Sequence, residues 1–93
     1  MYRIAPYNRR MIPDPTTHDK TPEYVQALIA SIGRSQKWIA LNSGISRRRL
    51  QYLLVGWREV DGVRNAVVLS YPEQWILQCL AEAVKTADRL SNT

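Results

Sequence analysis

Apolar residues recur at helical spacing soon after residue 20. Four of them occupy positions i, i+3, i+4 and i+7, which is one stripe of an amphipathic helix: Val25, Leu28, Ile29 and Ile32. Thr21 is a favourable N-cap, Pro22 suits the first helical position and Gly33 is a stop signal. The pattern predicts a helix from Pro22 to Gly33.

Two shorter helices are predicted next, each introduced by a serine and closed by a glycine. One covers residues 36–43 after Ser35, and the other follows its cap Ser46 and runs to Val55; Gly44 and Gly56 end them. Their expected inward residues are Trp38, Ile39, Ala40, Leu50, Leu53 and Leu54. Two short helices joined across a glycine form a helix-turn-helix arrangement.

The pattern changes after residue 56. Strand-forming runs at 57–60 and 63–69 flank Asp61-Gly62, a favoured hairpin turn, so a short β-hairpin is predicted at about 57–69. A structured loop is the alternative. Ser70 and Glu73 form a capping box, which predicts a last helix over about 71–89.

The first twenty residues lack apolar periodicity. They contain three prolines and scattered arginines, so we expect residues 1–20 to form an extended basic arm and not a packed element. Residues 21–93 then form one helix-turn-helix domain, with the motif at 36–56. The predicted fold class is mainly α: a compact bundle of four to five helices with an N-terminal arm and a short β-hairpin.

The formal net charge of +5 is unevenly distributed along the 93 residues. Residues 21–56 hold five basic residues against one acid, a balance of +4, and no carboxylate occurs between Glu23 and Glu59. This stretch projects positive potential, as a surface that binds a polyanion would. A solvated basic face is the alternative, and charge alone does not separate the two.

Composition argues against several other classes of protein. Cys79 and His18 are the sole cysteine and histidine, so the chain has no internal disulfide, no cysteine-rich zinc site and no pair of histidine ligands. We expect a buried thiol at Cys79 and a local cap at His18. No acid-base pair, phosphate-binding glycine loop or nucleophile constellation is present, so we predict no enzyme, cofactor, metal or small-molecule ligand. Apolar runs are too short for a membrane span or a signal peptide, and we expect a cytoplasmic protein.

The motif at 36–56 can be explained physically. Ala40 lies where the two helices cross, Gly44 supplies the positive φ of a tight turn, and Ile39, Ile45, Leu50 and Leu53 anchor the helices to the core. From Tyr24 to Gly56 the chain resembles the Cro/cI-type (XRE-like) helix-turn-helix regulators of bacteria and phages. The matching residues are Gln36, Ile39, Ala40, Gly44, Ile45, Leu50, Leu53 and Gly56.

The order of elements around the motif is also similar to that of the small anti-CRISPR-associated repressors of phages. The chain departs from the Cro/cI pattern at Ser43, where an apolar residue is usual, and at Val55-Gly56, where Asn-Gly is common. The segment 57–69 is longer than the usual connection.

The resemblance implies that the third helix reads DNA. The residues at the base-reading positions are Arg47, Arg48, Gln51 and Tyr52. Arginine can bind guanine through two hydrogen bonds, and glutamine can do the same with adenine. The expected contacts to the DNA backbone are Arg34, Gln36, Lys37, Ser46 and Arg49.

Other segments are assigned to the partner subunit or to DNA. The candidate dimer residues are Trp57, Val67, Leu69, Trp75 and Leu80, and the candidate minor-groove residues of the arm are Arg3, Arg9 and Arg10. Whether the arm and segment 57–69 contact DNA or the other subunit stays open.

We therefore expect a homodimeric, sequence-specific regulator of transcription that binds double-stranded DNA at an inverted repeat, and more specifically a repressor or autorepressor. The alternatives are a DNA-packaging protein similar to a phage terminase small subunit, which would form larger rings, and an RNA-binding regulator.

Overall fold

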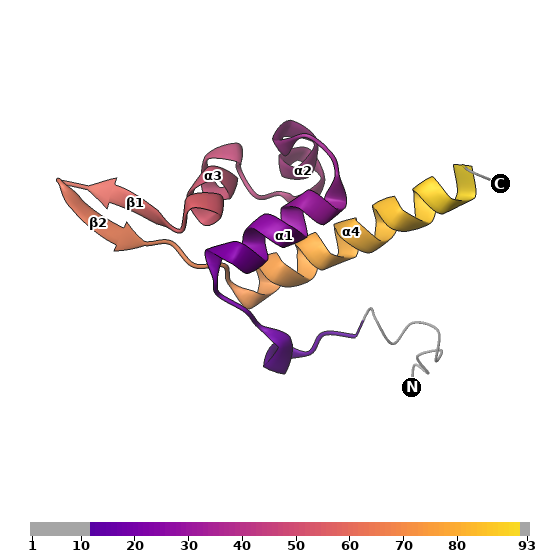
Figure 1. Ribbon diagram of the computed structural model, residues 1–93, viewed down its shortest axis with the longest axis horizontal. Coiled ribbons are helices and arrows are strands. Elements are labelled where there is room, and N and C mark those ends of the chain that lie inside the picture. Colours follow the sequence, from indigo (N-terminus) through magenta and orange to yellow (C-terminus); the bar gives the residue numbers. More distant parts are fainter. Residues whose placement is uncertain (1–11, 92–93) are drawn as a thin grey trace.

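The computed structural model describes residues 12–91 and is mainly helical (Figure 1). A short 3-10 helix η2 (Pro15–Thr17) comes first. The main elements are α1 (Pro22–Ile32), α2 (Gln36–Ser43), α3 (Arg47–Val55), β1 (Trp57–Val60), β2 (Val63–Ala66) and α4 (Tyr71–Ser91). The predicted fold class is confirmed, as are the positions of the predicted helices.

The predicted caps explain where the helices begin. The side chain of Thr21 accepts a hydrogen bond from the amide of Tyr24, and Ser35 and Ser46 cap α2 and α3 in the same way. The capping box of α4 also forms, because Ser70 N donates to Glu73 Oε1 at 3.0 Å and Glu73 N donates to Ser70 Oγ at 3.3 Å.

The core lies between the long helix α4 and the three shorter helices, with α1 running alongside α4 (Figure 1). Its buried apolar side chains are Val25, Leu28, Ile32, Ile39, Ile45, Leu50, Leu53, Val67, Leu69, Leu77 and Val84. Burial of this set, at about 25 cal/mol per Å² of apolar surface, is the main force that holds the four helices together.

Val67 and Leu69 belong to this core, so their prediction as dimer residues is wrong. They are 7% and 1% exposed, whereas Val68 between them is 48% exposed. The segment that returns from the hairpin to α4 is extended, and extended residues alternate between two sides. The side chains of Val67 and Leu69 consequently point inward and are part of the core.

The hairpin projects away from the helices (Figure 1). Its strands are antiparallel, with Trp57 opposite Ala66 and Val60 opposite Val63, and all eight strand residues are exposed. Asp61 and Gly62 both have positive φ, 51° and 78°, as the predicted type of two-residue turn requires. The second strand ends at Ala66, three residues earlier than the run of β-forming residues suggested.

The described part of the predicted arm is attached to the helices, which corrects the expectation that residues 1–20 are unpacked. Asp19 N donates to Gln74 Oε1 at 2.9 Å, and Gln74 Nε2 donates to the carbonyl oxygen of Thr17 at 3.0 Å. His18 Nε2 lies 2.7 Å from the carbonyl oxygen of Leu69, so His18 makes a tertiary contact and not the expected local cap. These contacts hold the chain before α1 against the start of α4.

Within residues 12–91, no helix has both the length and the apolar character needed to cross a bilayer.

Candidate nucleic-acid interface

Helix α3 has one buried side and one exposed side. Leu50 and Leu53 are buried in the core, while Arg47, Arg48 and Gln51 are exposed. The helical spacing predicts this division, since residues three apart share a side and the residues between them turn outward. Three of the four predicted base-reading residues thus lie on the surface of one helix.

Tyr52, the fourth predicted base-reading residue, is in a different position. Its side chain is half-buried and packs against the apolar core. Val55 occupies the next exposed position of α3, with 55% of its surface accessible. The exposed side of α3 consists of Arg47, Arg48, Gln51 and Val55, and these four residues are called the α3 outer face below.

The connection between α2 and α3 fixes the orientation of that face. Gly44 has a φ of 78°, and its amide donates to the carbonyl oxygen of Ala40 at 3.0 Å. Ile39 and Ile45 are buried on either side of this turn, and Ala40 is half-buried where α2 meets its neighbours. Ser43 accepts a hydrogen bond from the amide of Ile45 at 3.0 Å, which gives its hydroxyl a structural role at an otherwise apolar position.

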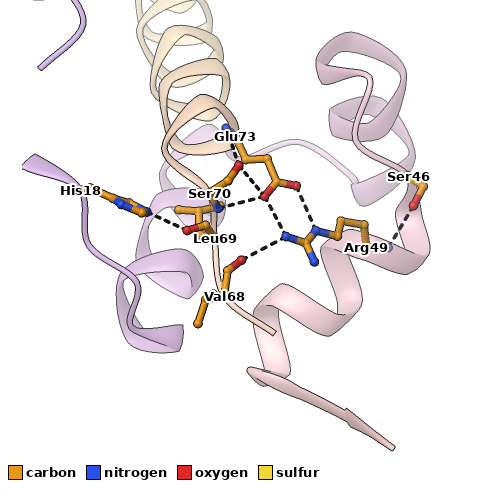
Figure 2. A network of polar contacts seen from close by, with 7 residues as sticks. All are labelled: His18, Ser46, Arg49, Val68, Leu69, Ser70 and Glu73. Carbon is orange, nitrogen blue, oxygen red and sulfur yellow. Dashed lines mark hydrogen bonds and ion pairs between the residues drawn. The ribbon is translucent and has the colours of Figure 1, made fainter. Parts of the chain in front are cut away.

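Arg49 is bound to Glu73 of α4 (Figure 2) and is half-buried, whereas Arg47 and Arg48 are exposed. Its Nε donates to Glu73 Oε2 at 3.0 Å, and its Nη2 donates to Glu73 Oε1 at 2.9 Å and to the carbonyl oxygen of Val68 at 3.0 Å. These contacts use most of the guanidinium donors within the protein. The geometry does not support the expected role of Arg49 as a contact to the DNA backbone, and it assigns Arg49 to joining α3 and α4.

Glu73 combines a cap and an ion pair in one carboxylate. Its Oε1 accepts hydrogen bonds from the amide and the hydroxyl of Ser70 as well as from Arg49. The guanidinium of Arg49 is the main reason that the pKa of Glu73 falls from 4.5 to about 2, and the same ion pair raises the pKa of Arg49. Glu73 is therefore ionised throughout the neutral and mildly acidic range.

Arg34, another predicted backbone contact, also points to α4. Its Nη2 lies 3.1 Å from Asp88 Oδ1, and its guanidinium lies 5.8 Å from the centre of the Trp38 ring. Both partners are on the surface, so this pair is weak and can exchange with another anion.

The remaining predicted contacts differ in accessibility. Lys37, Arg47 and Arg48 are exposed, and the structure records no ion pair for them among residues 12–91. Gln36 is half-buried at the start of α2. The Ser46 hydroxyl accepts the amide hydrogen of Arg49 at 3.1 Å, so it stabilises the start of α3.

Three basic side chains at the start of α3 oppose the helix dipole, which favours acids at this end. Glu73 neutralises only one of them. Arg47 and Arg48 have no ion pair within residues 12–91 and lie at the positive end of the helix dipole, where the side-chain charges and the helix end both favour an anion. The α3 outer face is therefore a positively charged surface that presents hydrogen-bond donors.

The other predicted dimer residues lie in three separate places. Trp57 is 37% exposed on the hairpin and lies under the guanidinium of Arg64, 3.9 Å from ring centre to carbon. Trp75 lines a cavity of about 480 Å³ between the segment 12–17, α1 and α4. Leu80 packs against the core. Arg3, Arg9 and Arg10 lie outside the described residues.

Two functional features escaped sequence reasoning: the Arg49–Glu73 ion pair and the buried Gln74. Residues 49 and 73 are separated by the whole hairpin, and the capping box already accounted for Glu73. Gln74 is completely buried, although glutamine is usually a surface residue. The available signal was its spacing, because Gln74 lies three residues before the buried Leu77 and therefore on the same side of α4.

No family model matches this sequence, and no curated protein sequence is detectably similar to it.

Proposed function

We propose that this protein is a sequence-specific DNA-binding regulator of transcription that places α3 in the major groove. Arg47, Arg48 and Gln51 contact base edges, and Lys37 together with the amides at the start of α2 contacts phosphates. The protein acts as a homodimer on an inverted repeat and represses transcription, with its own concentration as the regulatory signal.

A single observation carries the proposal: Arg47, Arg48 and Gln51 are exposed on a helix whose opposite side is locked into the core. Leu50 and Leu53 are buried, and Arg49 is fixed by two hydrogen bonds to Glu73 of α4 and one to the carbonyl oxygen of Val68. A rigid helix that presents two arginines and a glutamine can enter the major groove without losing much conformational entropy.

The homodimer follows from the information that one helix can read. A single recognition helix contacts a half-site of a few base pairs, which discriminates poorly among genomic sites. Two copies related by a two-fold axis read an inverted repeat with half-sites about one helical turn, roughly 34 Å, apart.

Selection of bound sequences from a random pool of duplex DNA tests the proposal directly. We expect a palindromic consensus with that half-site spacing. Against this consensus, Arg48→Ala should lower the affinity about 10- to 100-fold and relax the preference at one base position. Lys37→Ala should weaken binding to all duplexes equally and reduce the slope of log K against log salt by about one.

Lys85→Ala is the matched control, because it removes one positive charge from α4, away from the α3 outer face. Its affinity for the consensus should equal that of the wild type. A pool that yields no consensus, with rings larger than dimers in solution, would favour a DNA-packaging protein. Preferential competition by structured RNA would favour an RNA-binding regulator. Either result would overturn the proposed function.

A further inference from the structure

One flank of α4 carries no charged residue. At 100° per residue this flank is centred about 120° from the buried Leu77, and it is occupied by the α4 outer stripe, defined as Ile76, Cys79, Ala83, Ala87 and Leu90. The position directly opposite Leu77 is the polar residue Thr86, so the stripe lies between the core side of α4 and its polar side.

The charged residues of α4 lie on its other sides. Glu73 and Asp88 turn toward the helical body, where they bind Arg49 and Arg34. Glu82 and Lys85 line the cavity beside α1, and Arg89 follows on that same side of the helix. The α4 outer stripe itself contains no charge, although Ile76 is 36% exposed and Leu90 is 68% exposed.

The order of side-chain sizes along the stripe is symmetric about Ala83. Cys79 and Ala87 each lie four residues from Ala83, and Ile76 and Leu90 each lie seven residues from it. The order of side-chain size is thus large, small, small, small, large. When two such helices pair antiparallel about Ala83, Ile76 meets Leu90 of the other copy, Cys79 meets Ala87, and Ala83 meets Ala83.

We propose that the α4 outer stripe is the dimer interface, and that its occupant is the same stripe of a second copy in antiparallel orientation centred on Ala83. Three small residues at the centre allow the two helix axes to approach to about 8 Å, the lower end of the usual range. A two-fold interface requires a patch that is complementary to itself, and the symmetric order of the stripe meets that condition.

This interface deepens the proposed function, because it brings both α3 helices to one side of the dimer. The two-fold axis runs perpendicular to the paired helices and to the line that joins them. Glu73, which holds Arg49, lies roughly 80° around α4 from the centre of the stripe, close to the direction of that axis. A two-fold rotation leaves the position along its axis unchanged. If α3 lies to one side of α4 along that axis in one copy, it lies to the same side in the other copy, so both α3 helices lie on the same side of the dimer.

The expected affinity between the two copies follows from the area of the contact. The stripe spans 15 residues from Ile76 to Leu90, about 21 Å along the helix axis. Such a contact buries less than the ~800 Å² per partner of a standard interface, so we expect dissociation in the micromolar range. The solution mass of the full chain without DNA should rise with concentration from 10.7 kDa toward twice that value.

Ala83→Glu tests the centre of the interface. Glutamate is a good helix former at this exposed position, but it places two carboxylates on the two-fold axis, so the variant should stay monomeric at about 200 μM with an unchanged helical circular dichroism spectrum. Ala30→Glu, the same substitution at an exposed position of α1, should dimerise like the wild type. A wild type that stays monomeric at that concentration, or an Ala83→Glu variant that dimerises normally, would show that a second copy does not bind to the stripe and would overturn the proposal.

Cysteine cross-linking tests the register. Ala87→Cys should form an intermolecular disulfide with Cys79, and Ala83→Cys should form one with itself in a Cys79→Ser background. Wild-type Cys79 should not cross-link, because the two Cys79 residues are offset by about 12 Å along the helices and a disulfide requires Cα atoms within about 7 Å. Rapid cross-linking of wild-type Cys79 would indicate parallel helices and overturn the antiparallel register.

The interface and the proposed function fail separately in these experiments. The mass and cross-linking measurements contain no DNA, and Arg48→Ala should dimerise like the wild type. If the protein dimerises as expected but does not bind DNA sequence-specifically, the proposed function is wrong and the proposed interface is not.

Discussion

Gly44 and Gly56 have similar backbone conformations but different surroundings. Their φ angles are 78° and 93°, and each ends a helix. A Cβ added at Gly44 would have no heavy atom within 4 Å, whereas one added at Gly56 would lie 2.6 Å from Cγ of Pro22. The end of α3 therefore touches the first residue of α1, and only a residue without a side chain permits this approach.

The two glycines provide a matched test. Gly44→Ala should reduce the free energy of unfolding by about 1 kcal/mol, the cost of a left-handed alanine. Gly56→Ala carries that cost and also a steric overlap with Pro22, so we expect a loss of about 2–4 kcal/mol. Urea denaturation of both variants measures the difference, and equal losses would show that Pro22 moves aside freely.

At the scale of elements, α3 and α4 are joined by one ion pair. Arg49 from the first turn of α3 binds Glu73 from the first turn of α4, and each helix start is also capped by a serine (Figure 2). A bidentate arginine–carboxylate pair has a defined geometry, so it fixes the angle between the helices as well as adding stability. The orientation of the α3 outer face therefore depends on Arg49, which is not part of that face.

Acid titration should reveal this pair. The pKa of Glu73 is lowered from 4.5 to about 2, so its contribution is fully present above about pH 5 and is lost as the pH falls toward 2. We expect about 1–2 kcal/mol at neutral pH, less than the shift alone implies, because the Arg49 side chain is 39% exposed. Glu73→Gln should remove this contribution at neutral pH and flatten the stability profile between pH 5 and 2.

Glu59→Gln is the control for that titration, since it removes a carboxylate from the exposed hairpin. Its stability at neutral pH should match that of the wild type. Parallel pH profiles for the wild type and Glu73→Gln would contradict the role of the ion pair.

At the scale of the whole described molecule, Gln74 links the segment before α1 to α4. Its amide is completely buried, donates to Thr17 and accepts from Asp19. Leucine at this position would leave the Thr17 carbonyl and the Asp19 amide without these partners, at a cost of about 1–3 kcal/mol. The segment before α1 should then separate from α4 more readily than the helices separate from one another.

Limited proteolysis measures this separation. Trypsin should cut after Lys20, an exposed residue, several-fold faster in Gln74→Leu than in the wild type. Cleavage at the helical Lys85 serves as the internal reference. An equal increase at both sites would mean that Gln74 supports global stability and not the attachment of this segment.

Local structure was largely predictable because its causes are local. Thr21, Ser35 and Ser46 start helices through side-chain contacts three residues away, and apolar spacing identifies the buried sides of α1 and α3. The same reasoning placed Arg47, Arg48 and Gln51 on the surface, since the helical repeat alone decides which residues share a side with Leu50 and Leu53.

The sequence by itself thus determined the elements, their caps and the exposed basic side of one helix. Only the tertiary structure decided which cations are engaged: Arg49 and Arg34 bind carboxylates of α4, while Arg47 and Arg48 have no ion pair within residues 12–91. It likewise placed Val67 and Leu69 in the core and Gln74 beneath the segment before α1. The ion pairs and the hydrogen bonds of Gln74 join residues 24 to 57 positions apart, and no local periodicity encodes such contacts.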